Sequence, residues 1–93
     1  MQVCWTAPAV ADLAELRTYI GQRNRAAARQ VARRILAAVR KLGRFAALGR
    51  PGRVPGTREL VVTGTPYIIP YRVVGGRIEL LRVLHGARPW PGG

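Results

Sequence analysis

Several reactive side chains are absent, or nearly so, from this sequence of 93 residues. It contains no serine, one cysteine (Cys4) and one histidine (His85). A lone cysteine excludes an internal disulfide, and a single histidine beside it gives no zinc-binding pattern. A serine nucleophile is excluded, and Cys4 falls in an apolar segment, where a cysteine packs as a small hydrophobic residue. We therefore expect no metal, no cofactor and a reducing compartment, the cytoplasm.

Long apolar runs are absent as well. No stretch approaches the roughly 18 apolar residues that cross a bilayer, and residues 1–6 show no basic region followed by an apolar one, as a secretory signal would. Hydrophobic residues make up 48% of the chain and charged residues 22%, which is typical of a globular protein. The sequence therefore predicts one domain, residues 1–93, with no membrane partner.

Acidic residues are scarce. Lys and Arg total 16 against 4 Asp and Glu, which gives a formal net charge of +12. Lys41 is the only lysine, so arginine carries almost all of the positive charge. A field of this strength attracts polyanions or an acidic protein, and guanidinium groups bind phosphate or carboxylate through paired hydrogen bonds. The charge balance predicts a partner of one of these two kinds.

The segment 7–47 carries the signals of two helices. Thr6 is a good N-cap with Pro8 tolerated in the first turn, Gly21 is a stop signal, and Asn24 can open the second helix. Helical spacing predicts one apolar face on the first helix: Val10, Leu13, Leu16 or Arg17, and Ile20. It predicts another on the second helix: Ala28, Val31, Ile35, Val39 and Leu42.

The second helix also carries a basic stripe away from its apolar face. At 100° per residue, five arginines fall within about 100° of one another: Arg25, Arg29, Arg33, Arg40 and Arg44. Such a stripe is either a solvated helix face or a docking surface for an acidic partner or a nucleic acid.

The remaining segments predict a sheet. Four of them have the composition of strands: residues 2–5, 58–63, 67–74 and 77–85. Gly75-Gly76 is a strong hairpin signal, and Pro70 provides no ladder donor, so a bulge is expected there. The fold class is therefore α+β: a short N-terminal strand, a helical hairpin and then an antiparallel three-stranded meander, with the helices packed on one sheet face.

Polar residues on the strands supply the candidate chemistry. An arginine within a sheet needs a carboxylate, phosphate or carbonyl partner, and we expect Glu59 and Glu79 to form cross-strand ion pairs with arginines. One cluster could instead bind a phosphodiester: Arg72, Arg82, His85 and Arg88. His85, at the end of the last strand, has the titration range of a general acid. It could equally be a structural histidine bonded to backbone.

Four stretches, in this order and spacing, resemble the RelE/ParE superfamily of type II toxin–antitoxin toxins. They are Pro51-Gly52-Arg53 with Gly56-Thr57-Arg58-Glu59-Leu60, Tyr67-Ile68-Ile69-Pro70-Tyr71-Arg72-Val73, Ile78 to Arg88, and the opening Trp5-Thr6-Ala7-Pro8-Ala9 with Asp12-Leu13 and Tyr19-Ile20. The resemblance covers residues 3–90. It implies a small toxin held inactive by a cognate antitoxin, as a heterodimer that associates into a heterotetramer or larger complex.

The superfamily divides in function. RelE-like members cut mRNA at the ribosome, whereas ParE-like members poison DNA gyrase. Where RelE-like toxins carry catalytic lysines this chain has Glu59 and Val61, and where they carry a central-strand arginine it has Ile68; Arg88 does match an arginine after the last strand. The resemblance therefore favours a non-catalytic ParE-like gyrase inhibitor, with a ribosome-dependent mRNA endonuclease as the alternative. A plain nucleic-acid-binding module is the third hypothesis.

The charge pattern and the resemblance together suggest which residues meet the partners. The antitoxin is expected to lie in a groove along the two helices toward the sheet edge and to contact Arg29, Arg33 and Arg40. The target, gyrase or alternatively the ribosome and mRNA, is expected to meet Arg58, Arg88 and Trp90. If the protein is a ribonuclease, the catalytic candidates are the four residues of the phosphodiester cluster.

Overall fold

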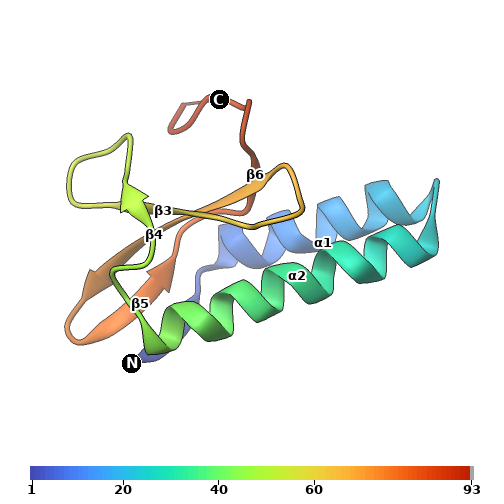
Figure 1. Ribbon diagram of the computed structural model, residues 1–93. Coiled ribbons are helices and arrows are strands. Elements are labelled where there is room, and N and C mark those ends of the chain that lie inside the picture. The colour runs from blue at the N-terminus through green and yellow to red at the C-terminus, as the bar shows by residue number, and fades with distance from the viewer. Residues whose placement is uncertain (93) are drawn as a thin grey trace.

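A helical hairpin covers one face of a sheet in the computed structural model, which describes residues 1–92 (Figure 1). The helices are α1 (Ala7–Gly21) and α2 (Arg25–Arg44). The strands are β1 (Gln2–Trp5), β2 (Arg50–Pro51), β3 (Arg58–Val61), β4 (Tyr67–Val74), β5 (Arg77–Leu80) and β6 (Leu84–His85). The predicted α+β class, with its N-terminal strand and helical hairpin, is confirmed. None of the helices within residues 1–92 is both long and apolar enough to cross a membrane.

Both helices begin where the capping signals predict. The Thr6 hydroxyl accepts from the Ala9 N–H at 3.4 Å, and the Asn24 side-chain oxygen accepts from the Ala27 N–H at 3.0 Å. Each cap satisfies one of the amide donors that the first helical turn leaves without a partner. The α1 helix ends at Gly21, as expected.

The predicted apolar face is confirmed more closely for α2 than for α1. The buried residues of α2 are Ala28, Ala32, Ile35, Val39 and Leu42, close to the prediction. In α1 the expected face is partly wrong, because Val10 is 53% exposed while Asp12 is buried. Asp12 binds Arg82 and the backbone of Val83, and these bonds turn its side of α1 toward the sheet.

The sheet has the order β1-β5-β4-β3-β2, with β6 beside the start of β4. The antiparallel meander β3–β4–β5 is present as predicted. The predicted N-terminal strand, β1, lies parallel to β5 at one edge of the meander, and β2, which was not predicted, pairs with β3 at the other edge. The Gly75-Gly76 hairpin is confirmed, and both glycines have positive φ, as a tight two-residue turn requires.

The predicted last strand, residues 77–85, is wrong as one element. It divides into β5 and β6, and Pro70 on β4 explains the break. The Leu81 N–H donates to the Pro70 carbonyl at 2.8 Å, but proline has no N–H with which to bond in return. The Val83 N–H turns away and donates to the Asp12 carboxylate at 2.9 Å. The bulge expected at Pro70 therefore lies in the strand opposite it.

The core lies between the helices and one sheet face. Ile35 and Leu42 of α2 pack against a layer that includes Ile69, Tyr71 and Leu80, all of them fully buried. The opposite sheet face is partly covered by the loop of residues 52–57 and by the tail of residues 86–91, both remote from the helices in Figure 1. These two sides of the sheet carry the two candidate surfaces.

Candidate functional site

The α2 helix is the most basic element of the molecule. Its cations are Arg25, Arg29, Arg33, Arg34, Arg40, Lys41 and Arg44, and it contains no acidic residue. Within residues 1–92 none of these side chains forms an ion pair with a carboxylate. The apolar stripe of the helix is buried, so its charged sides face outward. A helix of this kind presents a positive surface to a partner.

A groove of about 480 Å³ lies between α2 and β3. Its apolar wall includes Ala37, Ala38, Leu48, Leu60 and Val61, and its polar rim includes Arg34, Lys41 and Arg50. Large apolar side chains remain uncovered here, since Leu48 is 44% exposed and Val61 49% exposed. The groove combines apolar surface with positive charge, which suits an acidic, amphipathic polypeptide segment.

The groove follows an open strand edge. The β2 strand pairs only with Arg58 and Glu59 of β3, and within residues 1–92 no strand lies beside Val61 on that side. Successive residues of an antiparallel strand direct their backbone groups to opposite neighbours. Because the Val62 N–H donates to the Tyr67 carbonyl of the meander, the Val61 backbone faces the open edge. An unpaired edge of this kind can accept an added strand.

The expected antitoxin contacts lie on a different flank of α2. Arg29, Arg33 and Arg40 are exposed, and none of them lines this groove. Arg29 instead lines a shallow hollow between the two helices. The groove takes its basic rim from Arg34 and Lys41, each one residue, or about 100°, further round the helix. Sequence periodicity identified the basic stripe but could not show which flank faces β3.

Two members of the expected phosphodiester cluster are engaged with acidic residues. Arg72 binds Glu79 across the β4–β5 pair at 2.8 Å, which confirms the expected cross-strand ion pair. Hydrogen bonds from Arg72 and then Arg77 hold the pKa of Glu79 below its ordinary value. Arg82 binds Asp12 of α1 through two hydrogen bonds of 2.7 and 3.0 Å, and this contact raises the pKa of Arg82.

His85 lies apart from Arg72. It pairs with Tyr67 at the other end of β4, which is five residues, or about 16 Å, along the strand from Arg72 and on the opposite sheet face. The rings of Tyr67 and His85 meet edge to face at 6.0 Å, and His85 Nδ1 accepts from the Ala87 N–H at 3.2 Å. Burial, with a contribution from Tyr19, raises the pKa of Tyr67. Arg72 therefore lies apart from His85, and Arg82 is engaged with Asp12, so the structure does not bring the four residues of the expected cluster together.

The expected target contacts divide between the two sides of the sheet. The Arg58 guanidinium donates to the Gly49 carbonyl at 2.8 Å, on the side that faces the helices. Arg88 and Trp90 belong to the tail on the other side. Trp90 lines a hollow of about 500 Å³ together with residues that include Val54 and Arg72. The tail, rather than Arg58, forms part of a surface depression.

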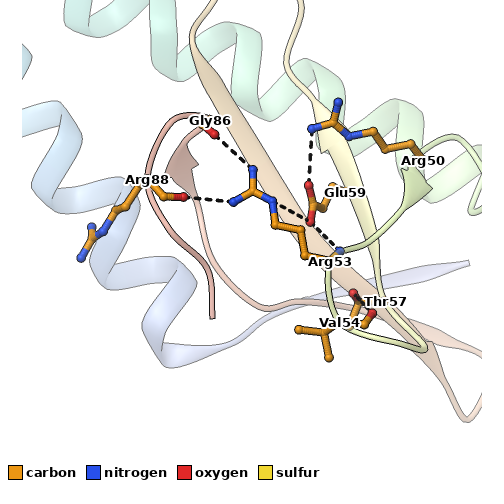
Figure 2. Close-up of polar contacts among 7 residues, drawn as sticks. All are labelled: Arg50, Arg53, Val54, Thr57, Glu59, Gly86 and Arg88. Atoms are coloured by element: carbon orange, nitrogen blue, oxygen red, sulfur yellow. Dashed lines mark hydrogen bonds and ion pairs between the residues drawn. The ribbon is translucent and has the colours of Figure 1, made fainter. Parts of the chain in front are cut away.

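Sequence reasoning did not indicate the role of Arg53, whose side chain joins separate parts of the chain. Figure 2 shows its guanidinium between the buried Glu59 carboxylate and the backbone carbonyls of Gly86 and Arg88. Glu59 also pairs with Arg50 at 3.4 Å, a cross-strand ion pair whose arginine could not be chosen from sequence alone. No group of three or more potential metal ligands of the His, Cys, Asp and Glu types lies together in residues 1–92.

Comparison with known proteins gives consistent matches. The family model described as ParE toxin of type II toxin-antitoxin system, parDE, matches residues 3–90. Y4kP of Sinorhizobium fredii is 43% identical over 90 residues, which cover 97% of this chain and 93% of the relative. Toxin RelE2 of Caulobacter vibrioides is 41% identical over 87 residues, with 94% and 97% covered.

Solved structures agree with these matches. The chromosomal ParDE toxin–antitoxin system from P. aeruginosa contains a chain with a TM-score of 0.85 and 32% identity, covering 91% of this chain and 95% of that one. The toxin–antitoxin complex RelBE2 from Mycobacterium tuberculosis gives a TM-score of 0.58 and 28% identity, with 90% and 95% covered. The match along residues 3–90, with the shared fold, shows that this chain belongs to the ParE family of type II toxin–antitoxin toxins, within the RelE/ParE superfamily.

Proposed function

We propose that this protein is a gyrase-inhibiting toxin, neutralised by a cognate antitoxin. The main observation in support is that the candidate RNA-cleaving residues do not lie together. Arg72 and Arg82 are engaged with Glu79 and Asp12, and His85 lies on another sheet face from Arg72. A phosphodiester-cleaving site needs its acid and its cationic groups together on one phosphate. Binding a target protein needs only a suitable surface.

The likeness to the ParDE structure supports the same proposal. Its TM-score of 0.85 exceeds the 0.58 found for the RelBE2 complex, at similar coverage. We assign the target contact to Arg88 and Trp90 of the tail, because tryptophan and arginine are the residue types that dominate binding energy at protein interfaces. Arg58 donates to the Gly49 carbonyl on the other side of the sheet, so it is not part of the same target-binding surface.

The antitoxin fits the groove between α2 and β3. An acidic segment would place carboxylates beside Arg34 and Lys41 and cover the exposed Leu48 and Val61. It would also add backbone hydrogen bonds along the open edge of β3. Such docking would form the heterodimer, and we propose that two heterodimers associate into a heterotetramer or a larger complex. Arg29, Arg33 and Arg40 would then provide a weaker, longer-range attraction.

One observation favours the alternative function, ribosome-dependent mRNA cleavage. A relative that is 41% identical over 87 residues bears the name Toxin RelE2. In that case Arg88 and His85 would be the residues that contact the RNA, because they are the adjacent pair of the expected cluster. The Arg88 N–H donates to the His85 carbonyl at 2.9 Å.

The two functions are separated by paired assays on the purified toxin. One follows supercoiling of relaxed plasmid by gyrase and the appearance of cleaved DNA, and the other follows translation of a reporter mRNA in a cell-free system. The proposal predicts loss of supercoiling with cleaved DNA while translation continues. Blocked translation with cut mRNA and normal gyrase would instead establish the endonuclease. The double variant His85→Ala, Arg88→Ala then provides the control, since it should abolish cleavage of mRNA.

A further inference from the structure

We propose that Arg53 is a positioning residue that fixes the tail of residues 86–91 for target binding. The proposal rests on the proposed function, because it assigns the target contact to Arg88 and Trp90. Arg53 lies 35 residues before Arg88 in sequence, yet its side chain donates to the Arg88 carbonyl at 3.0 Å and to the Gly86 carbonyl at 3.1 Å. The tail and the loop of residues 52–57 are thereby joined into one surface.

The loop itself is closed by its own hydrogen bonds. The Gly52 N–H donates to the Thr57 carbonyl at 2.8 Å, and the Thr57 hydroxyl donates to the Val54 carbonyl at 2.6 Å. A Cβ at Gly52 would lie 2.9 Å from the Thr57 backbone, so this close approach requires glycine. The closed loop presents Arg53 to β3 in a fixed position.

Glu59 supplies the anchor. Its side chain is only 2% exposed, and its carboxylate accepts the Arg53 backbone N–H at 2.9 Å. The Arg53 and Arg50 guanidinium groups lie 3.5 and 3.4 Å from the same carboxylate. A buried carboxylate needs such partners to offset its lost hydration. Because the backbone N–H and Arg50 both remain when the Arg53 side chain is removed, the loop keeps its anchor without that side chain.

The tail is held from two directions. Its first amide bonds inward, since the Gly86 N–H donates to the Pro66 carbonyl at 2.7 Å. Its carbonyls bond to the Arg53 guanidinium, which points toward the tail in Figure 2. Charge-assisted hydrogen bonds are stronger than neutral ones. Arg53 therefore connects the tail to the body of the sheet on this face.

A hollow forms where the joined segments meet. Its lining includes Val54 and Pro55 from the loop, Trp90 and Pro91 from the tail, and Arg72 from β4, around a volume of about 500 Å³. Pre-organised surfaces bind better than mobile ones because less conformational entropy is lost on association. Fixing the tail should therefore lower the concentration of toxin needed to inhibit the target.

The test compares Arg53→Ala with Arg77→Ala. Arg77 is a matched control, because its guanidinium also binds a glutamate on this sheet, Glu79 at 3.1 Å, but within residues 1–92 it makes no hydrogen bond to the tail. Both substitutions remove one positive charge and one Arg–Glu contact. A third variant, Arg53→Lys, keeps the charge but has a single ammonium where the guanidinium reaches two carbonyls and a carboxylate.

Four quantities are measured for each variant. Amide hydrogen exchange at Gly86, Ala87, Arg88 and Trp90 reports the tail, gyrase supercoiling reports the target, and antitoxin affinity with the melting temperature reports the fold. For Arg53→Ala we expect exchange at Gly86 and Arg88 to rise by about tenfold or more, and the inhibitory concentration to rise by a similar factor. Antitoxin affinity should stay within about threefold, and Arg53→Lys should fall between wild type and Arg53→Ala. Arg77→Ala should leave tail exchange and inhibition near wild type.

The outcomes separate this proposal from the proposed function. Unchanged tail exchange in Arg53→Ala would overturn the positioning role, and so would faster exchange with unchanged inhibition. A parallel loss of melting temperature, antitoxin affinity and inhibition in Arg53→Ala would show a merely structural role and would also overturn it. If wild-type toxin leaves gyrase active, the proposed function fails instead. The tail exchange and the growth arrest caused by each variant in cells then still decide whether Arg53 positions the tail.

Discussion

Arginines on the sheet and arginines on α2 have opposite surroundings in this protein. On the sheet and its loops, Arg50, Arg53, Arg72, Arg77 and Arg82 bind carboxylates, whereas Arg58 donates to backbone carbonyls. The α2 helix has seven cations, and within residues 1–92 none of them forms such a pair. Three of the four acidic residues of the chain serve the first group. The fold uses its few carboxylates on the sheet and leaves the helix charge to be neutralised from outside.

This difference separates stability from binding. Removing one partner of a buried, hydrogen-bonded ion pair strongly destabilises the fold. An exposed arginine without a carboxylate contributes little to stability but attracts acidic partners over about 10 Å. Substitutions of the buried carboxylates Asp12 and Glu59 should therefore change folding, and substitutions of the α2 cations should change association.

The largest expected effect breaks the Asp12–Arg82 pair. Asp12→Ala removes the acceptor of two Arg82 hydrogen bonds and of the Val83 N–H, and leaves these donors without a partner next to the core. We expect the free energy of unfolding to fall by about 3 kcal/mol, as measured by urea denaturation.

The control for this variant is Glu15→Ala on the same helix. Glu15 is exposed and forms no ion pair within residues 1–92. Its loss should change the free energy of unfolding by less than about 0.5 kcal/mol. Equal effects of the two substitutions would contradict the division between the two groups of charges.

The second prediction compares the two flanks of α2. The double variant Arg34→Glu, Lys41→Glu reverses the rim of the groove, and Arg33→Glu, Arg40→Glu reverses the outer flank with the same change in net charge. We expect antitoxin affinity to fall about 100-fold for the first pair and less than about tenfold for the second. Titration calorimetry at one fixed salt concentration measures both, and the opposite order would place the antitoxin on the outer flank.

The smallest predicted effect concerns Glu79. Hydrogen bonds from Arg72 and Arg77 lower its pKa from an ordinary value of 4.5. A carboxyl group whose pKa is lower in the folded than in the unfolded state stabilises the fold above its unfolded pKa, and this stabilisation disappears as the pH falls through the folded pKa. Glu79→Gln should therefore be less stable than wild type at neutral pH, and the two should converge in acid. Urea midpoints across this range measure the effect, and a difference independent of pH would exclude the linkage.

Local signals in the sequence predicted the local parts of the fold. Thr6 and Asn24 cap the helices, and Gly75-Gly76 forms the hairpin, because each depends only on its immediate neighbours. The break between β5 and β6 was missed. Pro70 removes a hydrogen bond from the strand opposite it, so its effect appears at residues 81–83, which are distant in sequence.

The candidate site was less predictable than the fold for the same reason. The arginine stripe on α2 follows from helical periodicity, but only the packing of α2 against β3 shows that Arg34 and Lys41 border the groove. Arg53 gave no signal as a tail contact, because its acceptors are backbone carbonyls more than thirty residues away, and backbone groups carry no sequence pattern. The sequence thus identified the charged helix, and the tertiary structure showed which of its flanks borders the groove.

Amide hydrogen exchange of the toxin with and without its cognate antitoxin tests directly whether the antitoxin binds beside the α2 cations or on the paired arginines of the sheet. If the groove between α2 and β3 receives the antitoxin, exchange at the Val61 amide should slow by about 100-fold or more, because an added strand would bond to this open edge. The amides of Gly86, Ala87, Arg88 and Trp90 in the tail should change little. Protection of the tail, with Val61 unchanged, would contradict the account, because it would place the antitoxin on the paired arginines of the sheet instead of beside the unpaired cations of α2.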